Sequence, residues 1–373
     1  YMQQLIELEL VQRNAEKSRE MADTIPTLML AEKYRQHGVT LVELMIALAI
    51  GLLVTVAMLK VYVDASRMYR FNEGLARVQE NGRFGLEFLR RDARVAGFWG
   101  CYSDATLTNG VSATSNAYIN VGAGHITGTS DDGLNSSDSI TFRSATGSGA
   151  LVTSGMSGTG GNVTVESVGA LSTNTAVLIS DCEDGDLFQV TGIAGTALAH
   201  AAGANANVSP NLNKAYAAGS RVYEAREATF CIAPGADPAQ PALRRLVNPT
   251  PGQTCASNGD ELLEGIENMQ ILYGEDTDAD ADGANGDGTA NRYVTFGASG
   301  LDIDRIVSVR ISLLARSINN NLTTEPAPYT FNGSSVTPGS TDKYLRKVFT
   351  TTVTLRNKAC LLYTSPSPRD QLQ

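Results

Sequence analysis

The acidic segment 275–288, which reads EDTDADADGANGDG, carries the side chains most suited to chemistry. Asp278, Asp280 and Asp282 alternate along it and Gly283 follows them, which matches the D-x-D-x-D-G start of a calcium-binding loop. Carboxylates at this spacing converge on one hard cation when a glycine permits the sharp turn between them. The segment is therefore a candidate calcium site, and calcium is the only cofactor that the sequence suggests.

The same segment departs from a complete calcium loop at its twelfth position. Thr289 stands where an EF-hand has a bidentate glutamate, and Asp287 is the carboxylate that could contribute instead. Without an ion these carboxylates would repel one another, which favours the metal. A solvated acidic turn between two strands is the alternative, and the sequence leaves both interpretations open.

The rest of the sequence lacks the motifs of common catalytic and nucleotide-binding sites. It contains no G-x-x-x-x-G-K-[ST], H-E-x-x-H, G-x-S-x-G or G-x-G-x-x-G. Of its three histidines, His125 and His200 stand in polar, turn-rich sequence. The net charge of −10 disfavours a nucleic-acid partner. We therefore expect no enzymatic activity and no nucleic-acid binding.

An apolar segment at residues 39–59 reads VTLVELMIALAIGLLVTVAML and contains one charged residue, Glu43. Its 21 residues would span about 31 Å as a helix, which is close to the thickness of a bilayer core. A secretory signal peptide would end in a small-x-small cleavage site, which residues 58–61 (MLKV) do not provide. A simple anchor would explain the length but not Glu43, because a carboxylate within lipid is costly and usually marks a function.

The residues HG followed by VTLVELMIALAIGLLV resemble the class III signal of type IV prepilins and pseudopilins. The resemblance implies that a prepilin peptidase cuts after Gly38 and that Val39 becomes the N-methylated first residue, although this family usually has phenylalanine there. It also implies that Glu43, the fifth mature residue, pairs with the amine of Val39, its own or a neighbour's. This pair would set the register between subunits, whose helices 39–59 form the filament core.

The helical pattern continues through residues 60–97, where we expect an amphipathic helix. Apolar side chains recur at helical spacing and predict one stripe that packs against a sheet: Leu75, Val78, Phe84, Phe88 and Leu89. Gly74, Gly82 and Gly85 each weaken a helix by up to about 1 kcal/mol relative to alanine. A bend near residues 82–85 is therefore expected.

Residues 79–101, which read QENGRFGLEFLRRDARVAGFWGC, are similar to the PilW family of minor pilins. In that family a similar helix leads into an aromatic-Gly-Cys turn. Later stretches with the same resemblance are residues 265–278, 291–294, 308–317 and 349–357. The resemblance implies a minor pilin that acts in pilus assembly, in a priming or tip complex, and has no turnover of its own.

Residues 98–359 predict a β-rich head, because short alternating runs are separated by turn-forming residues. The expected strands are residues 139–144, 162–168, 175–180, 221–225, 227–233, 243–247, 269–273, 306–316 and 346–355. The fold class is then α+β, with a long N-terminal helix, half membrane-spanning and half amphipathic, packed on an antiparallel sheet.

Four cysteines fall in this head: Cys101, Cys182, Cys231 and Cys255. An even number beyond a membrane segment suits disulfides in the oxidising periplasm. Three pairings are possible, and we prefer the sequential one, Cys101 with Cys182 and Cys231 with Cys255. A zinc site is the alternative, although no C-x-x-C spacing is present. Free buried thiols are another.

Both ends of the sequence differ in character from the rest. Residues 1–38 are expected to be upstream read-through followed by the prepilin leader. Residues 360–370, CLLYTSPSPRD, resemble the in-frame translation of a transposase-derived sequencing adapter, so we expect residues 360–373 to be an artefactual tail that includes Cys360.

The resemblance implies a single-pass protein of the inner membrane whose head lies in the periplasm and later in the extracellular pilus. Its expected partners are other minor pilins, the major pilin, prepilin peptidase and the pilus assembly platform. A J-like pseudopilin of a type II secretion system is the alternative within this superfamily. A membrane-anchored adhesin or calcium-binding module is the alternative of another class.

Overall fold

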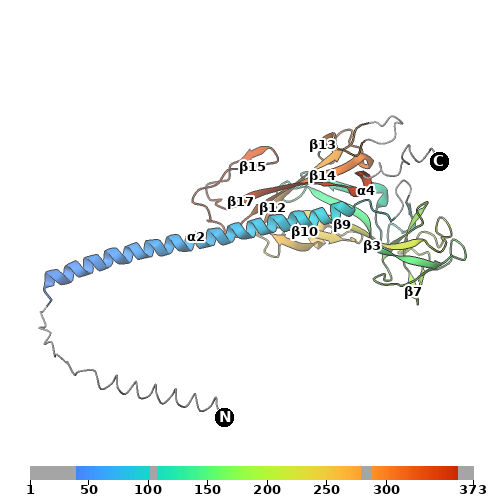
Figure 1. Cartoon of the computed structure of the whole chain (residues 1–373), viewed down its shortest axis with the longest axis horizontal. Helices are drawn as coiled ribbons and strands as arrows, with labels where there is room; N and C mark the ends of the chain where they lie inside the picture. The colour runs from blue at the N-terminus through green and yellow to red at the C-terminus, as the bar shows by residue number, and fades with distance from the viewer. Residues whose placement is uncertain (1–38, 101–106, 279–286, 360–373) are drawn as a thin grey trace, which may run out of the picture. The chain divides into compact units, whose positions relative to one another are not determined.

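The structure is a computed structural model that describes residues 39–100, 107–278 and 287–359 (Figure 1). The chain divides into two compact units, Tyr1–Asp64 and Ala65–Gln373. One helix, α2 (Leu41–Val95), begins in the first unit and ends in the second. In the first unit, every described residue of this helix is exposed.

In the second unit, α2 buries a face that contains two glycines as well as apolar side chains. Val78 and Leu89 are buried, as predicted, but Phe84 and Phe88 are 51% and 36% exposed, so the prediction that they belong to the core stripe is wrong. Gly82 and Gly85 take the positions against the sheet instead. The ring of Phe349 and the side chain of Leu313 fill the space that a side chain at these glycines would need. Helix α2 continues without interruption through the predicted bend.

A four-stranded sheet faces this part of α2, in the order β13-β12-β14-β17. It consists of β12 (Ile266–Glu275), β13 (Arg292–Val294), β14 (Ile306–Arg316) and β17 (Arg346–Thr354). All of its pairings are antiparallel. Strands β12, β14 and β17 overlap the strands expected from the alternating sequence, which confirms that part of the prediction.

A larger sheet is built around two long strands, β3 (Ser139–Ser154) and β9 (Arg221–Pro234). Strand β9 joins the two separately predicted strands 221–225 and 227–233 into one. The other members are β1 (Thr108–Asn109), β2 (Ile126–Thr129), β4 (Val163–Val165), β5 (Ala176–Ser180), β6 (Gly185–Gln189), β7 (Gly192–Ala194), β8 (Ala197–Ala199), β10 (Pro241–Val247) and β11 (Asp260–Glu264).

Short elements complete the described chain. They are the 3-10 turns η1 (Val121–Ala123) and η2 (Ile303–Arg305), the helices α3 (Cys255–Asn258) and α4 (Arg356–Ala359), and the hairpin of β15 (Tyr329–Phe331) with β16 (Ser334–Val336).

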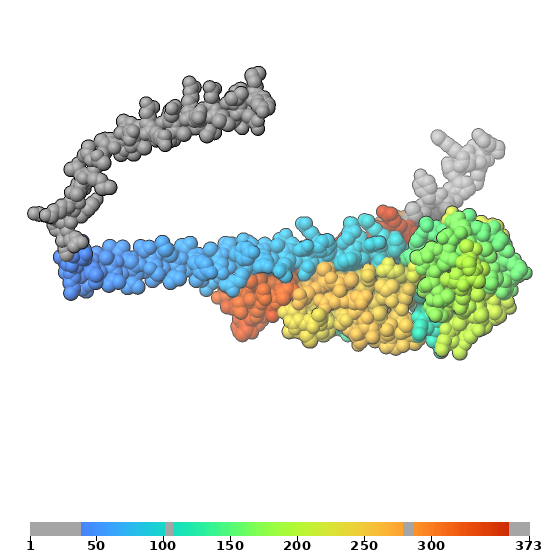
Figure 2. Space-filling model, turned by 90° about the horizontal axis from the view of Figure 1, so that it is seen from below, coloured from blue at the N-terminus to red at the C-terminus, as the bar shows by residue number. Residues whose placement is uncertain are grey.

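The main core lies between the two sheets and the buried face of α2. It takes Leu89 from the helix, Phe230 from β9 and Ile311 from β14, each fully buried. Two further clusters fill the part of the head built from residues 107–225, which forms the green lobe in Figure 2. One of them surrounds Phe188 and Tyr216, and the other surrounds Leu178 and Leu187.

Two ion pairs fix strands of the head to their neighbours. Arg143 on β3 contacts Glu227 on β9 at 2.6 Å, with both side chains largely buried. Asp92, which is buried on α2, accepts a hydrogen bond from Arg226 at 3.3 Å. Burial raises the pKa of the Asp92 carboxyl, and the positive charge of Arg226 partly opposes that rise. The second pair ties the end of α2 to the larger sheet.

Candidate functional site

The start of α2 is capped by its own sequence. The Thr40 hydroxyl accepts a hydrogen bond from the backbone N–H of Glu43 at 3.2 Å, and the Thr40 carbonyl accepts one from Leu44 at 3.1 Å. This is the first half of a capping box, in which a threonine precedes a glutamate by three residues. Glu43 therefore lies in the first helical turn, where the positive end of the helix dipole favours a carboxylate. The Thr-x-x-Glu spacing could have revealed Thr40 from the sequence.

The described residue before this cap is Val39, which is 68% exposed. Its predicted role as a new N-terminus places a free amine beside the first turn that holds Glu43. Gly38, the residue before the predicted cleavage point, lies outside the described residues. The assignments of Gly38, Val39 and Glu43 to cleavage, methylation and filament register stay predictions.

An open groove runs along one side of the exposed half of α2. Val39 lies at one end of it, Glu43 follows four residues later, and small residues continue at the same spacing through Ala47, Gly51 and Thr55. Nothing lies within 4 Å of the position that a side chain at Gly51 would occupy. Small residues at this spacing allow close contact between helices in an apolar environment. An 18-residue window of α2 has a mean hydropathy of 2.5, so the helix is long and apolar enough to cross a membrane.

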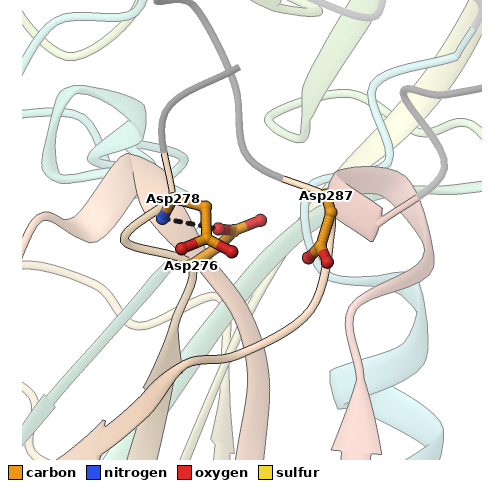
Figure 3. A group of neighbouring side chains, drawn as sticks. All are labelled: Asp276, Asp278 and Asp287. Atoms are coloured by element: carbon orange, nitrogen blue, oxygen red, sulfur yellow. Dashed lines mark hydrogen bonds between the residues drawn. The ribbon is translucent and has the colours of Figure 1, made fainter. Parts of the chain in front are cut away.

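Three carboxylates converge where the acidic segment leaves and rejoins the four-stranded sheet (Figure 3). They belong to Asp276, Asp278 and Asp287, and one oxygen of each lies within 4.8 Å of the others. Asp276 is buried, whereas Asp278 and Asp287 are exposed. The sequence predicted Asp278 and Asp287 for this site but missed Asp276. Asp276 stands one residue after β12, so its position at the end of a buried strand was the available signal.

Hydrogen bonds orient these carboxylates. Asp276 accepts backbone N–H groups of Asp278 at 3.1 Å and Gly288 at 2.7 Å, which connects both sides of the acidic segment. The side-chain amide of Asn291 donates to Asp278 at 2.9 Å. Asp287 accepts the backbone N–H of Thr289 at 2.8 Å. Oxygen ligands of this kind suit a hard cation such as calcium.

Polar contacts fix the backbone of the strands and turns beside the carboxylate cluster. The buried carboxylate of Glu275 contacts the guanidinium of Arg292 at 2.6 Å and accepts the backbone N–H of Asp302 at 3.0 Å. Arg305 donates to the carbonyl of Asp278. Asp280 and Asp282, the other predicted ligands, lie outside the described residues.

The cysteines of the head are partly described. Cys231 on β9 forms a disulfide with Cys255 at the start of α3, as the sequential pairing predicts, with Cα atoms 6.1 Å apart. Thr254 caps that short helix by accepting the backbone N–H of Ser257 at 3.3 Å. Cys182 lies between β5 and β6, but its predicted partner Cys101 lies outside the described residues, so that pairing stays a prediction.

Comparisons with known proteins identify two matching families. The family described as Type IV Pilus-assembly protein W matches residues 229–357, and the prokaryotic N-terminal methylation motif matches residues 33–59. No curated protein matches the chain. Among solved structures, the chain is similar to the type IV-like pilin TTHA1219 from Thermus thermophilus, at 14% identity and a TM-score of 0.31. That similarity covers 76% of this chain and 98% of the other.

Proposed function

We propose that this chain, which its two family matches indicate to be a type IV pilus minor pilin of the PilW family, acts in the complex that primes pilus assembly and remains at the tip. The proposal includes cleavage after Gly38, methylation of Val39 and insertion in the inner membrane with the head in the periplasm. Other minor pilins, the major pilin, prepilin peptidase and the assembly platform are its partners. Pilins are structural subunits, so the chemistry of the chain is association.

The start of α2 carries this proposal. It is apolar, exposed and capped by Thr40, and it lies within the residues that match the methylation motif. All of its described side chains from residue 39 to residue 59 are exposed, so this segment needs lipid or other helices around it. In the membrane, lipid would cover it. In a filament, the equivalent helices of neighbouring subunits would cover it, and the groove from Glu43 to Thr55 would admit a close approach.

Glu43 would then need a positive partner. A carboxylate in a dry helix bundle is costly unless it is paired, and the α-amine of a processed Val39 is the nearest candidate. Methylation keeps the positive charge of that amine. Because such a pair has one correct position along the helix, it would select the stagger between neighbouring subunits.

The first test of the proposal uses mass spectrometry and one substitution. Membrane-extracted protein should begin at an N-methylated Val39. Glu43→Ala should leave insertion and cleavage intact but reduce recovery in sheared pili, because breaking a buried pair from one side costs about 3–5 kcal/mol. Glu73→Ala is the matched control, since Glu73 is an exposed carboxylate of the same helix that pairs with Arg77 at 3.1 Å. Equal recovery of both variants would contradict the role of Glu43.

A second function, calcium binding, is favoured by the convergence of Asp276, Asp278 and Asp287. We propose that the ion is held by these three carboxylates, with Asp280 and Asp282 as further candidates from the sequence. Bound calcium would neutralise their mutual repulsion and join the two sides of the acidic segment. The ligand set lacks a bidentate glutamate at position twelve, so a weak site of about 10⁻⁴–10⁻³ M is expected.

Thermal unfolding with calcium or with a chelator tests this proposal. Calcium at a hundredfold excess over Kd should stabilise the folded chain by about 2.7 kcal/mol. Magnesium at equal ionic strength controls for screening. Asp287→Asn should lose the calcium effect, whereas Glu166→Gln, an exposed carboxylate in the other part of the head, should keep it. An equal calcium shift in both variants would assign the segment to a solvated turn.

A further inference from the structure

The four-stranded sheet has β13 at one edge and β17 at the other, and the two edges differ in how well they are protected against pairing with another strand. At one edge, β13 has three residues, and the neighbouring pairing of β12 with β14 is irregular at Gly274 and Glu275. At the other edge, β17 has nine residues and contains no proline or glycine. It pairs with β14 without any shift from Ser308↔Thr354 to Arg316↔Arg346. Long regular edges of this kind are normally shortened, bulged or covered in natural proteins.

Hydrogen bonds at both ends of β17 show which of its groups point outward. Leu355 donates to the carbonyl of Val307 at 2.8 Å, and Ser317 donates to the carbonyl of Leu345 at 2.8 Å. Both pairs lie in the same register as β14 and β17. Because bonded and non-bonded pairs alternate in an antiparallel ladder, the odd-numbered residues of β17 bond to β14. The even-numbered residues therefore direct their N–H and C=O groups away from the sheet.

These outward groups belong to Arg346, Val348, Thr350, Thr352 and Thr354. Within the described part of the chain, no hydrogen bond engages their backbone groups. The three threonine side chains are also exposed. They continue a polar row on the sheet, in which Ser312 and Thr350 hydroxyls lie 3.0 Å apart.

The strand that presents these groups is held in place by its other side. Val353 is buried in the main core, and the ring of Phe349 packs beside Gly82 of α2. Arg346 anchors the start of the strand, since it contacts Glu267 at 2.6 Å and Asp342 at 2.8 Å. The outward groups are thus fixed in an extended conformation before any partner arrives, which reduces the entropy lost on binding.

We infer that the free edge of β17 binds an extended segment of another pilin-class chain, which adds a strand to the sheet beside β14 and β17. The main-chain groups of that segment would pair with the outward groups of Val348, Thr350, Thr352 and Thr354. Lys347 and Arg356 are exposed near the two ends of the edge, so carboxylates flanking the incoming strand would complement it. This inference rests on the proposed function, because it takes the partner from the same assembly.

Pairing geometry distinguishes a different chain from a second copy of this one. Figure 1 shows β17 running along the second half of α2, and Phe349 contacts that helix at Gly82. Antiparallel pairing of two copies would point the head-packed halves of their α2 helices in opposite directions, unlike the common helix direction expected of subunits in one filament. Pairing about a two-fold axis along the strand would set each outward residue opposite itself. In a parallel pair, however, an outward residue bonds to the two neighbours of the residue opposite it, and not to that residue. The outward groups of two copies would therefore not bond to one another in this arrangement.

The experiment places a photo-crosslinking residue, p-benzoylphenylalanine, at position 352 of the full chain in cells that assemble pili. The control position is Glu166, which is exposed elsewhere in the head. The expected adduct at position 352 contains a different chain that itself carries an N-terminal methylation motif. No adduct above the level at position 166, or adducts only with chains that lack this motif, would overturn the inference.

Backbone and side-chain contributions are separated by two matched double variants. Thr350→Pro with Thr352→Pro removes two outward N–H donors without touching the ladder to β14, because proline is tolerated where the N–H faces away from a sheet. Thr350→Ala with Thr352→Ala keeps both donors. The proline pair should lower the yield of an adduct from position 354 about tenfold or more, and the alanine pair should leave it unchanged. Equal yields in the two pairs would refute edge pairing.

Amide hydrogen exchange gives a readout that does not depend on folding of the proline pair. In the isolated wild-type protein, the amides of Thr350 and Thr352 should exchange much faster than those of Thr351 and Val353. In assembled pili all four should be protected, and unchanged fast exchange there would refute the inference. The inference and the proposed function fail separately. Recovery of the chain in sheared pili without an adduct overturns only the inference, whereas a pilin adduct in membranes without recovery in pili overturns only the tip assignment.

Discussion

Gly82 lies where α2 meets β17, and substituting it by alanine tests how the helix packs on the head. A Cβ atom at this position would lie 2.2 Å from Cε2 and 2.3 Å from Cδ2 of Phe349. The ring would therefore have to move, and overpacking of this kind costs about 1–3 kcal/mol. Alanine also favours the helix by up to about 1 kcal/mol relative to glycine. We therefore expect Gly82→Ala to destabilise the head by up to about 2 kcal/mol.

The measurement is chemical denaturation of the detergent-solubilised chain, followed by near-ultraviolet circular dichroism of the head. Gly74→Ala is the matched control, because the atom closest to its Cβ would be a terminal methyl group of Leu322, which can move aside. This variant should be neutral or slightly more stable than the wild type. A second comparison combines Gly82→Ala with Phe349→Leu, which shortens the opposing side chain.

The double variant isolates the contact itself. If the ring is the obstacle, the two substitutions together should cost less than the sum of their separate effects, by about 0.5 kcal/mol or more. Additive effects would refute the reasoning, and so would a Gly82→Ala protein as stable as the Gly74→Ala control. Either result would mean that the glycine is not required by the approach of Phe349.

Two further predictions concern the stability of the head. Cys255→Ser should lower the free energy of unfolding by about 3 kcal/mol, because the disulfide to Cys231 closes a loop over a sequence separation of 24. An unfolding midpoint that is insensitive to reductant in the wild type would contradict this. Burial raises the pKa of Asp186 above 3.8, so the folded head binds this proton more tightly than the unfolded chain does. Stability from this group is fully present below pH 3.8 and is lost as the pH rises through the raised pKa. Asp186→Asn should therefore flatten the part of the stability profile that lies above pH 3.8.

Parts of the fold could be predicted because their sequence periods are local. Strands β12, β14 and β17 alternate apolar and polar residues, since one side of each faces the main core. The strong hydropathy of residues 39–59 likewise depends only on neighbouring residues. Strand β9 was predicted as two strands, because the central polar residues Glu224, Arg226 and Glu227 hide its continuity. Arg226 and Glu227 are paired with partners distant in sequence, namely Asp92 and Arg143.

The face of α2 could not be predicted in the same way. Sequence hydrophobicity places Phe84 and Phe88 in the core stripe, and it treats Gly82 and Gly85 as weak points. The structure reverses these roles because the opposing sheet supplies Phe349 and Leu313, which need space in the helix surface rather than side chains from it. Knowing this requires the pairing of segments more than two hundred residues apart.

The acidic cluster shows a related limit of motif reading. The D-x-D-x-D-G pattern directs attention to residues within the segment, whereas the structure brings together its two ends. Asp276 contributes because β12 ends at Glu275, and Asp287 contributes because the chain must return to pair as β13. Among the described residues, strand pairing therefore brings these three carboxylates together. It follows that shortening the segment between Asp278 and Asp287 should preserve the carboxylate cluster as long as Tyr273 still pairs with Val294.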